Sequence, residues 1–105
     1  MIILYTNLHE LVLGGFFIMS YNESSAMTTL FLEASKDKNG KVINDGNQIV
    51  SNNKLIAKLD NPVSRAVWED FFEQFCIEGL LQRVGSSGEV FKLTTKGLMA
   101  ANALR

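Results

Sequence analysis

Cysteine, proline and histidine each occur once in these 105 residues, and 10 basic residues nearly balance 11 acidic ones for a net charge of −1. A single cysteine cannot form an internal disulfide or a thiolate metal site, so we expect a cytoplasmic protein. A net charge near zero excludes long-range capture of nucleic acid by the whole chain, which leaves a local basic patch to consider. The length and the 47% of hydrophobic residues suit one domain with a core.

Residue types that build catalytic and metal sites are equally scarce. The sequence offers no Ser-His-Asp set, no pair of His or Cys at metal-ligand spacing and no phosphate-binding glycine motif. Glu69 and Asp70 are neighbours on a predicted helix, so their side chains point in different directions and do not form an acid–base pair. We therefore expect that the protein is not an enzyme and uses no metal and no cofactor.

Residues 1–18 differ from the rest of the chain because they are mostly apolar and contain no Lys or Arg. Polar residues between positions 6 and 10 interrupt a membrane helix, and a secretory signal would need basic residues first. Two interpretations stay open. The segment is a helix that packs on the domain or on a partner, or it is a leader upstream of a true start at Met19, since Gly14-Gly15 can be encoded by a ribosome-binding run of bacterial type. We predict an extension over 1–18, one domain over 19–105 and no membrane association.

The first helix of that domain is predicted from residue 20 to near Ser35. Ser20 and Glu23 fit a capping box, and an apolar stripe follows at helical spacing: Met27, Leu30, Phe31 and Ala34. Residues 36–47 contain two turn signals, Asn39-Gly40 and Asp45-Gly46, and predict a loop or short hairpin. A calcium loop with Gly40 at its sixth position would begin at Ser35 and end at Gly46, neither of which supplies a carboxylate, so we expect an ordinary turn. A very short strand is expected at 48–50.

The next two helices are predicted from capping residues and apolar spacing. Ser51 or Asn52 can cap a short helix that carries Leu55, Ile56 and Leu59 on one face. Asn61-Pro62 ends it and starts a long helix that runs to about Arg83, in which Gly79 marks the turn of the chain. Its apolar stripe contains Trp68, Phe71, Phe72, Phe75 and Leu80, which we expect in the core.

A two-stranded hairpin and a last helix complete the predicted domain. Residues 81–84 and 89–94 flank the polar tip at 85–88, and Val90, Lys92 and Thr94 alternate with Phe91 and Leu93 as in a half-buried strand. Thr94 or Thr95 can then cap a short helix that reaches the C-terminus.

This order of elements resembles a winged helix-turn-helix domain, and residues 75–97 are similar to a pattern shared by regulators of the multiple-antibiotic-resistance and PadR types. The matching residues are Phe75, Gly79, Leu80, Leu81, Phe91, Leu93, Thr94 and Gly97. The resemblance implies a mainly helical α+β fold, with a three-helix core, a two-stranded wing and a short C-terminal helix. It also implies a small bacterial transcriptional regulator that binds double-stranded DNA as a homodimer.

Such a domain reads the major groove with its second helix and touches the backbone with its wing. Carried over to this sequence, the DNA-binding positions are Asn52, Asn53 and Lys54 at the start of the preceding helix, Ser64, Arg65 and Glu69 on the recognition helix, and Ser86, Ser87 and Lys92 in the wing.

The distribution of charge favours a second interpretation. Residues 61–84 carry two Arg and four acidic residues, a net charge of −2 that repels phosphate, whereas 36–60 and 85–105 each carry +2. The alternative function is therefore a module for protein–protein interaction or dimerisation, with Ile77 and the apolar extension as contacts. A positive stripe from Lys54 past Arg65 to Lys92 would favour DNA, and a negative helix face with exposed Ile77 would favour protein contact.

Overall fold

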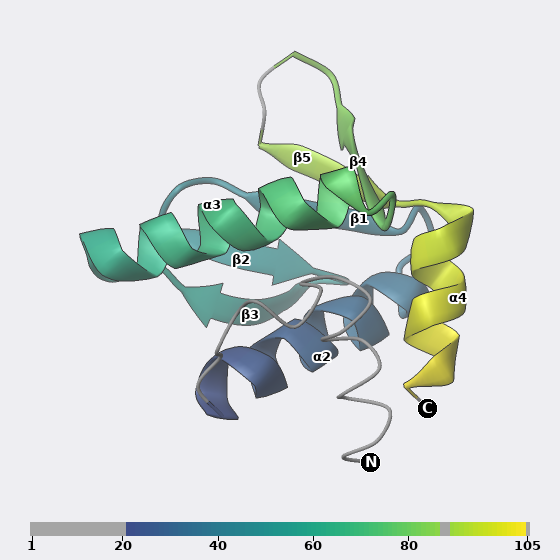
Figure 1. Ribbon diagram of the computed structural model, residues 1–105, viewed down its shortest axis with the longest axis horizontal. Coiled ribbons are helices and arrows are strands. Elements are labelled where there is room, and N and C mark those ends of the chain that lie inside the picture. The colour runs from purple at the N-terminus through teal and green to yellow at the C-terminus, as the bar shows by residue number, and fades with distance from the viewer. Residues whose placement is uncertain (1–20, 87–88, 105) are drawn as a thin grey trace.

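The computed structural model describes residues 21–86 and 89–104. The predicted extension over 1–18, the predicted cap Ser20 and the wing residue Ser87 lie outside these ranges. The described chain contains three helices and five strands, in the order α2 (Tyr21–Lys36), β1 (Lys41–Asn44), β2 (Gln48–Ser51), β3 (Lys54–Lys58), α3 (Pro62–Ile77), β4 (Leu81–Val84), β5 (Val90–Leu93) and α4 (Thr95–Ala103). Figure 1 shows the β4–β5 hairpin at the top of the view and α4 at the right.

All five strands form one antiparallel sheet in the order β3-β2-β1-β5-β4. The hairpin predicted as a wing, β4–β5, is joined to a β1–β2–β3 meander because β5 pairs with β1, with Val42 opposite Phe91. The described chain is therefore α+β with a single five-stranded sheet. The prediction of a mainly helical winged helix-turn-helix fold, with three core helices and a two-stranded wing, is wrong.

The largest local correction concerns residues 51–60, where a helix was expected and β3 is found. Asn52 and Asn53 form the two-residue turn between β2 and β3, with φ of 53° and 61°. A hairpin turn of this kind needs positive φ at both central residues, and Asn accepts that conformation better than most residues. The prediction that Asn52, Asn53 and Lys54 begin a DNA-facing helix is therefore wrong.

The Asn53 turn gives a first testable expectation. Because Asn53 has a φ of 61°, Asn53→Ala should lower the free energy of unfolding by about 1 kcal/mol, since Ala lacks the short polar side chain that lets Asn adopt left-handed backbone. Asn53→Gly is the matched control and should leave stability unchanged or slightly raised. Urea unfolding of the three proteins measures the difference, and an equal loss in both variants would contradict this assignment of the turn.

Both ends of α3 follow from local chemistry. The Asn61 side chain accepts a hydrogen bond from the Ser64 amide at 2.9 Å, and Pro62 occupies the first turn, as predicted. At the other end, the amide of Gly79 (φ 74°) donates to Cys76 and that of Leu80 donates to Phe75, which forms a Schellman motif. The helix therefore ends at Ile77, and its predicted continuation to about Arg83 is wrong.

The core lies between the sheet and α2 and α3. Phe31 of α2 meets Phe75 of α3 edge to face, with ring centroids 5.1 Å apart, and Phe72 of α3 stacks on Phe91 of β5 at 4.5 Å. The predicted helix over 20–35 is confirmed as α2, and its stripe is buried as expected. Both helices thus cover one face of the sheet, and aromatic contact joins them.

The last helix is attached to the start of β4 by a tight contact. The Thr94 hydroxyl donates to the Gly79 carbonyl and accepts a bond from the Gly97 amide at 3.0 Å, so it caps α4 as predicted. Gly97 faces the Leu80 carbonyl so closely that any Cβ would overlap it. The Thr-x-x-Gly part of the motif therefore has a physical reason: it caps the helix and lets it approach the strand.

Candidate interaction surface

The two faces of the sheet differ because one is covered by helices and the other is not. On the covered face, β1 and β2 contribute Val42 and Ile49, both 0% exposed, and β5 contributes Phe91 and Leu93. The intervening residues point the opposite way because side chains alternate along a strand. No helix in the described ranges lies over this second face, which we call the open face.

An apolar row crosses the open face from one edge strand to the other. The register places five apolar side chains opposite one another across all strands, and we call them the apolar row: Leu55, Val50, Ile43, Val90 and Val84. The three central members are half-buried by their neighbours in the sheet. The two end members stay more accessible, since Leu55 is 51% and Val84 is 43% exposed.

Two lysines lie beside the middle of this row. Lys41 of β1 and Lys92 of β5 are directly opposite each other, both are exposed, and Gln82 of β4 continues the line. Like charges directly opposite across two strands destabilise a sheet. The lysine pair therefore creates a local positive potential, and an anionic partner would offset the repulsion between the two charges. On the other side of the row, Lys58 lies opposite Gln48.

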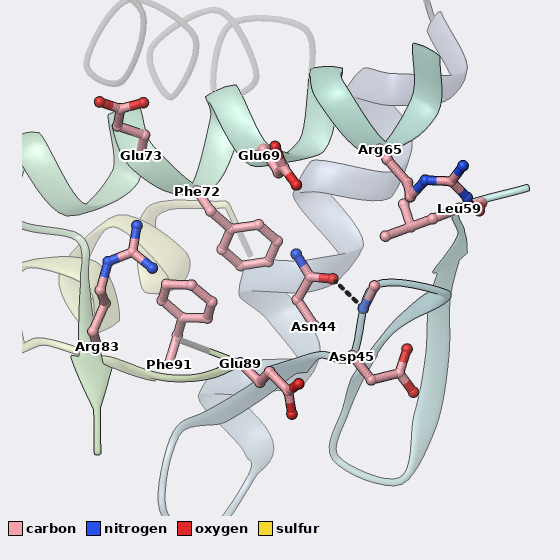
Figure 2. Close-up of a pocket in the computed structure, with 11 residues that line it drawn as sticks. Asn44, Asp45, Leu59, Arg65, Glu69, Phe72, Glu73, Arg83, Glu89 and Phe91 are labelled. Atoms are coloured by element: carbon pink, nitrogen blue, oxygen red, sulfur yellow. Dashed lines mark hydrogen bonds between the residues drawn. The ribbon is translucent and has the colours of Figure 1, made fainter. Parts of the chain in front are cut away.

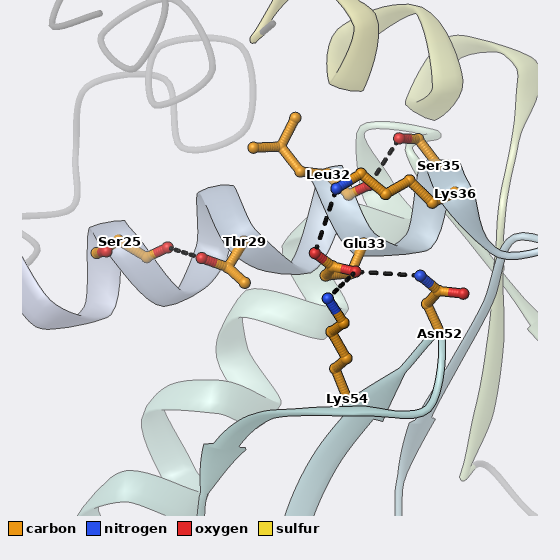
Figure 3. A network of polar contacts seen from close by, with 8 residues as sticks. All are labelled: Ser25, Thr29, Leu32, Glu33, Ser35, Lys36, Asn52 and Lys54. Atoms are coloured by element: carbon orange, nitrogen blue, oxygen red, sulfur yellow. Dashed lines mark hydrogen bonds and ion pairs between the residues drawn. The ribbon is translucent and has the colours of Figure 1, made fainter.

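The predicted site residues Asn52 and Lys54 lie away from the open face, where they contact α2. The Glu33 carboxylate accepts a hydrogen bond from Asn52 Nδ2 at 3.1 Å and lies 3.8 Å from Lys54 Nζ. Figure 3 shows both side chains reaching this carboxylate from the β2–β3 hairpin. Lys36 lies 3.6 Å from the other carboxylate oxygen. These contacts attach the β2–β3 hairpin to α2, so their role is structural. Asn53 is exposed in the adjoining turn.

The Glu33 network predicts a pH dependence of stability. The hydrogen bond from Asn52, assisted by Lys36 and Lys54, outweighs the burial of the carboxyl and holds the pKa of Glu33 below its usual value. A lowered pKa in the folded state stabilises the protein above the usual carboxyl range, and this contribution is lost as pH falls through the lowered pKa. We therefore expect Glu33→Gln to lower the urea midpoint at neutral pH.

At low pH the two proteins should become more alike. The difference in urea midpoint between wild type and Glu33→Gln should narrow towards about pH 3, because protonated Glu33 no longer interacts as an anion. Urea midpoints measured at both pH values provide the check. A difference that stays constant would show that Glu33 contributes by packing alone.

Two further predicted residues, Arg65 and Glu69, line a cleft of about 400 Å³ between α3 and the covered face of the sheet (Figure 2). Arg65 Nη1 donates to the Leu59 carbonyl at 3.2 Å, which ties α3 to the end of β3. The guanidinium of Arg83 lies over the Phe91 ring, 5.1 Å from its centroid. The cleft contains two arginines and four acidic residues, a mixture that selects no single class of ligand: Arg65, Arg83, Asp45, Glu69, Glu73 and Glu89.

The predicted DNA-binding residues are not brought together. Lys54 and Arg65 are associated with opposite ends of β3, since Lys54 begins the strand and Arg65 bonds to Leu59, which follows it. Lys92 lies on the open face, Ser64 is in the first turn of α3, and Ser86 follows β4. A continuous stripe from Lys54 past Arg65 to Lys92 is therefore not formed. Exposed Ile77, at 68%, lies on the acidic helix.

The open face was missed by sequence reasoning. Lys41 and the apolar row were not among the predicted site residues, although Lys92 was. Residues 41–44 and 48–51 each read polar-apolar-apolar-polar, so neither four-residue strand shows the alternation that indicates a half-buried strand. The row itself depends on the β1–β5 pairing, which joins residues about 50 positions apart and has no local signature.

The fold and surface together define an α+β protein with one antiparallel sheet, helices on one face and an apolar row with adjacent lysines on the other. No family model matches the chain, and no match is found among curated proteins or solved structures.

Two further observations apply to the described ranges. Within them, no three His, Cys, Asp or Glu side chains are grouped closely enough to hold a metal ion. None of the helices in this part of the chain has the length and apolar character to span a bilayer.

Proposed function

We propose that this chain is a protein-interaction module whose open sheet face binds a partner protein. The observation that carries the proposal is the apolar row, which crosses all five strands without a described helix above it. Apolar side chains gathered in one exposed patch are typical of contact surfaces. The row spans four gaps of about 4.8 Å, or about 19 Å, which is long enough for the centre of a small interface.

The positive charge of the open face indicates what kind of partner surface it can bind. The charged side chains that the strands place on the open face are Lys41, Lys92 and Lys58, all positive. Two copies stacked open face to open face would bring lysines near lysines, and unlike potentials favour association. The partner is therefore a protein surface with apolar residues beside acidic ones.

Geometry favours a protein partner over duplex DNA. The major groove is about 12 Å wide and admits a two-stranded ribbon, whereas five strands span about 19 Å. The helix-turn-helix on which the expectation of DNA binding depended is absent from the described chain, and α3 exposes Glu69, Asp70 and Glu73. DNA binding stays a prediction from the sequence alone.

Two designed helical peptides test the proposal. They share one apolar stripe, and the flanking positions are Glu in one and Lys in the other. Fluorescence anisotropy at low salt should show binding of the Glu peptide at least tenfold tighter than that of the Lys peptide. Leu55→Glu and Val84→Glu should each weaken the Glu peptide about tenfold or more, because they replace accessible members of the row with carboxylates.

Val63→Glu is the matched control. Val63 is also an exposed apolar residue, at 72%, but it lies on α3 away from the open face. The variant should bind the Glu peptide as wild type does. Equal affinity for both peptides, or equal losses in Val63→Glu and Leu55→Glu, would overturn the proposal.

A further inference from the structure

The outer side of α3 carries a stripe that complements the open face. Five residues with side chains exposed to solvent recur at spacings of three and four, and we call them the outer stripe: Val63, Ala66, Asp70, Glu73 and Ile77. At 100° per residue, they lie opposite the aromatics that α3 buries, Trp68, Phe71, Phe72 and Phe75. The stripe therefore points away from the sheet, with Glu73 at its edge, where it also borders the cleft of Arg65 and Arg83.

The lengths of the two surfaces agree. Val63 and Ile77 are 14 residues apart, which is about 21 Å along a helix that rises 1.5 Å per residue. The apolar row is about 19 Å long between Leu55 and Val84. The outer stripe thus ends in exposed apolar residues, 72% and 68% accessible, at nearly the separation of the accessible ends of the row.

The charges agree as well. Asp70 and Glu73 lie in the middle of the outer stripe, with Glu69 beside them, and all three are exposed. Lys41 and Lys92 lie on β1 and β5, two of the inner strands, beside the middle of the apolar row. A helix laid along the row would place its carboxylates near these lysines and its two apolar ends near Leu55 and Val84. It would also relieve the repulsion between the paired lysines.

We propose that the chain associates with itself head to tail, the outer stripe of α3 in one copy docking on the open face of the next. The inference rests on the proposed function, because it identifies a second copy as a partner for the open face. The two surfaces lie on opposite sides of the molecule, so one copy can use both at once. A heterologous contact of this kind leads to a ring or an open chain of copies.

One helix on one sheet face gives a small interface with exposed ion pairs. Such an interface is weak and salt-dependent, since about 0.5 M salt screens charges beyond a few Å. In sedimentation velocity at low salt, the weight-average mass should therefore rise with protein concentration. At about 0.5 M salt it should return to the monomer value.

Two variants separate the surfaces. The helix variant is Asp70→Lys with Glu73→Lys, and the sheet variant is Leu55→Glu with Val84→Glu, which breaks the apolar row but leaves the lysines that would repel the reversed stripe. Each should sediment as a monomer, because each lacks one half of the contact. Asn102→Glu, an exposed change on α4, is the control and should associate as wild type does.

Mixing the two variants gives the sharpest result. The helix variant keeps an intact open face and the sheet variant keeps an intact outer stripe, so an equimolar mixture should form 1:1 dimers and nothing larger. Adding Val84→Glu to the helix variant should abolish these dimers while its net charge stays positive, which separates the docking contact from general attraction between opposite charges.

Three outcomes would overturn the inference. They are a wild-type chain that stays monomeric at about 1 mM in low salt, a mixture that stays monomeric, and a mixture whose pairing survives Val84→Glu. If the chain is monomeric but the Glu peptide still binds the open face, head-to-tail association fails and the proposed function stands. If the peptide also fails to bind, both fail.

Discussion

Replacing Gly97 by alanine is expected to lower the free energy of unfolding by about 3 kcal/mol, at the upper end of the usual cost of overpacking. The added Cβ would overlap the Leu80 carbonyl oxygen and come within 3.0 Å of a Leu93 methyl carbon. The carbonyl cannot easily move away, because it accepts a hydrogen bond from the Thr94 amide at 3.1 Å. The helix must shift instead, and its cap on Thr94 weakens.

Urea unfolding measures this loss, and Ala103→Gly is the matched control. Ala103 is the exposed last residue of the same helix, so its change to Gly should cost about 0.5 kcal/mol or less, because the full propensity cost of Gly applies only in a helix interior. Gly97→Ala improves propensity, so any loss of stability reports the contact with Leu80. A Gly97→Ala protein as stable as wild type would contradict the close approach of α4 to β4.

Phe75→Ala is the second change with a large expected effect, a loss of about 4 kcal/mol. Phe75 is 0% exposed, and its ring meets Phe31 at 5.1 Å and Phe72 at 6.1 Å. Truncation would open a cavity where α2 and α3 meet, whereas the hydrogen bond from the Leu80 amide to the backbone carbonyl of residue 75 would remain. Small domains have about 5–15 kcal/mol in total, so much of the population could unfold on warming.

Ile77→Ala is the matched control, because it separates the effect of burial on stability from the effect of truncating a large apolar side chain on the same helix. Ile77 lies two residues further along the same helix but is 68% exposed, so its truncation should change stability by about 0.5 kcal/mol or less. Thermal and urea unfolding of both variants provide the measurement. Similar losses in the two proteins would mean that Phe75 is not the centre of the core.

The C-terminal third was the most predictable part of the fold, because its signals are local. Gly79 ends α3 through positive φ, the strand over 90–93 alternates, and Thr94 caps α4. The reason for Gly97 was not visible in the sequence, since it depends on a carbonyl 17 residues away. Correct local elements nevertheless led to a wrong fold, because their assembly with the first half of the chain was assumed from a resemblance.

The failure at residues 51–60 has a specific cause. Leu55, Ile56 and Leu59 fit one face of a short helix, and the β-bulge between β2 and β3 breaks the regular alternation that would have indicated a strand. Asn52-Asn53 could be taken as a helix cap or as a hairpin turn, and sequence spacing did not separate the two. Pairing with β2 makes this segment a strand: Ile49 of β2 is buried, and Ala57 of β3 lies opposite it.

For the functional surface, the sequence shows where the charged residues lie along the chain. It does not show which side chains come together on one face of the sheet. The acidic stretch over 61–84 and the candidate contact Ile77 were visible, and Ile77 and three of the four acidic residues lie on α3. The apolar row was hidden because each of its members comes from a different strand, and register across the β1–β5 pairing brings them together.

Methyl chemical shifts test the central claim, that the open face binds a partner, most directly. The protein, labelled at Ile, Leu and Val methyl groups, is titrated with the Glu peptide. If the open face binds the peptide, the methyl chemical shifts of Ile43, Val50 and Val90, whose side chains point to that face, should change during the titration. Those of buried Val42 and Ile49 should not change. Shifts confined to methyl groups beside the cleft of Arg65 and Arg83, or no shifts at saturating peptide, would contradict the claim.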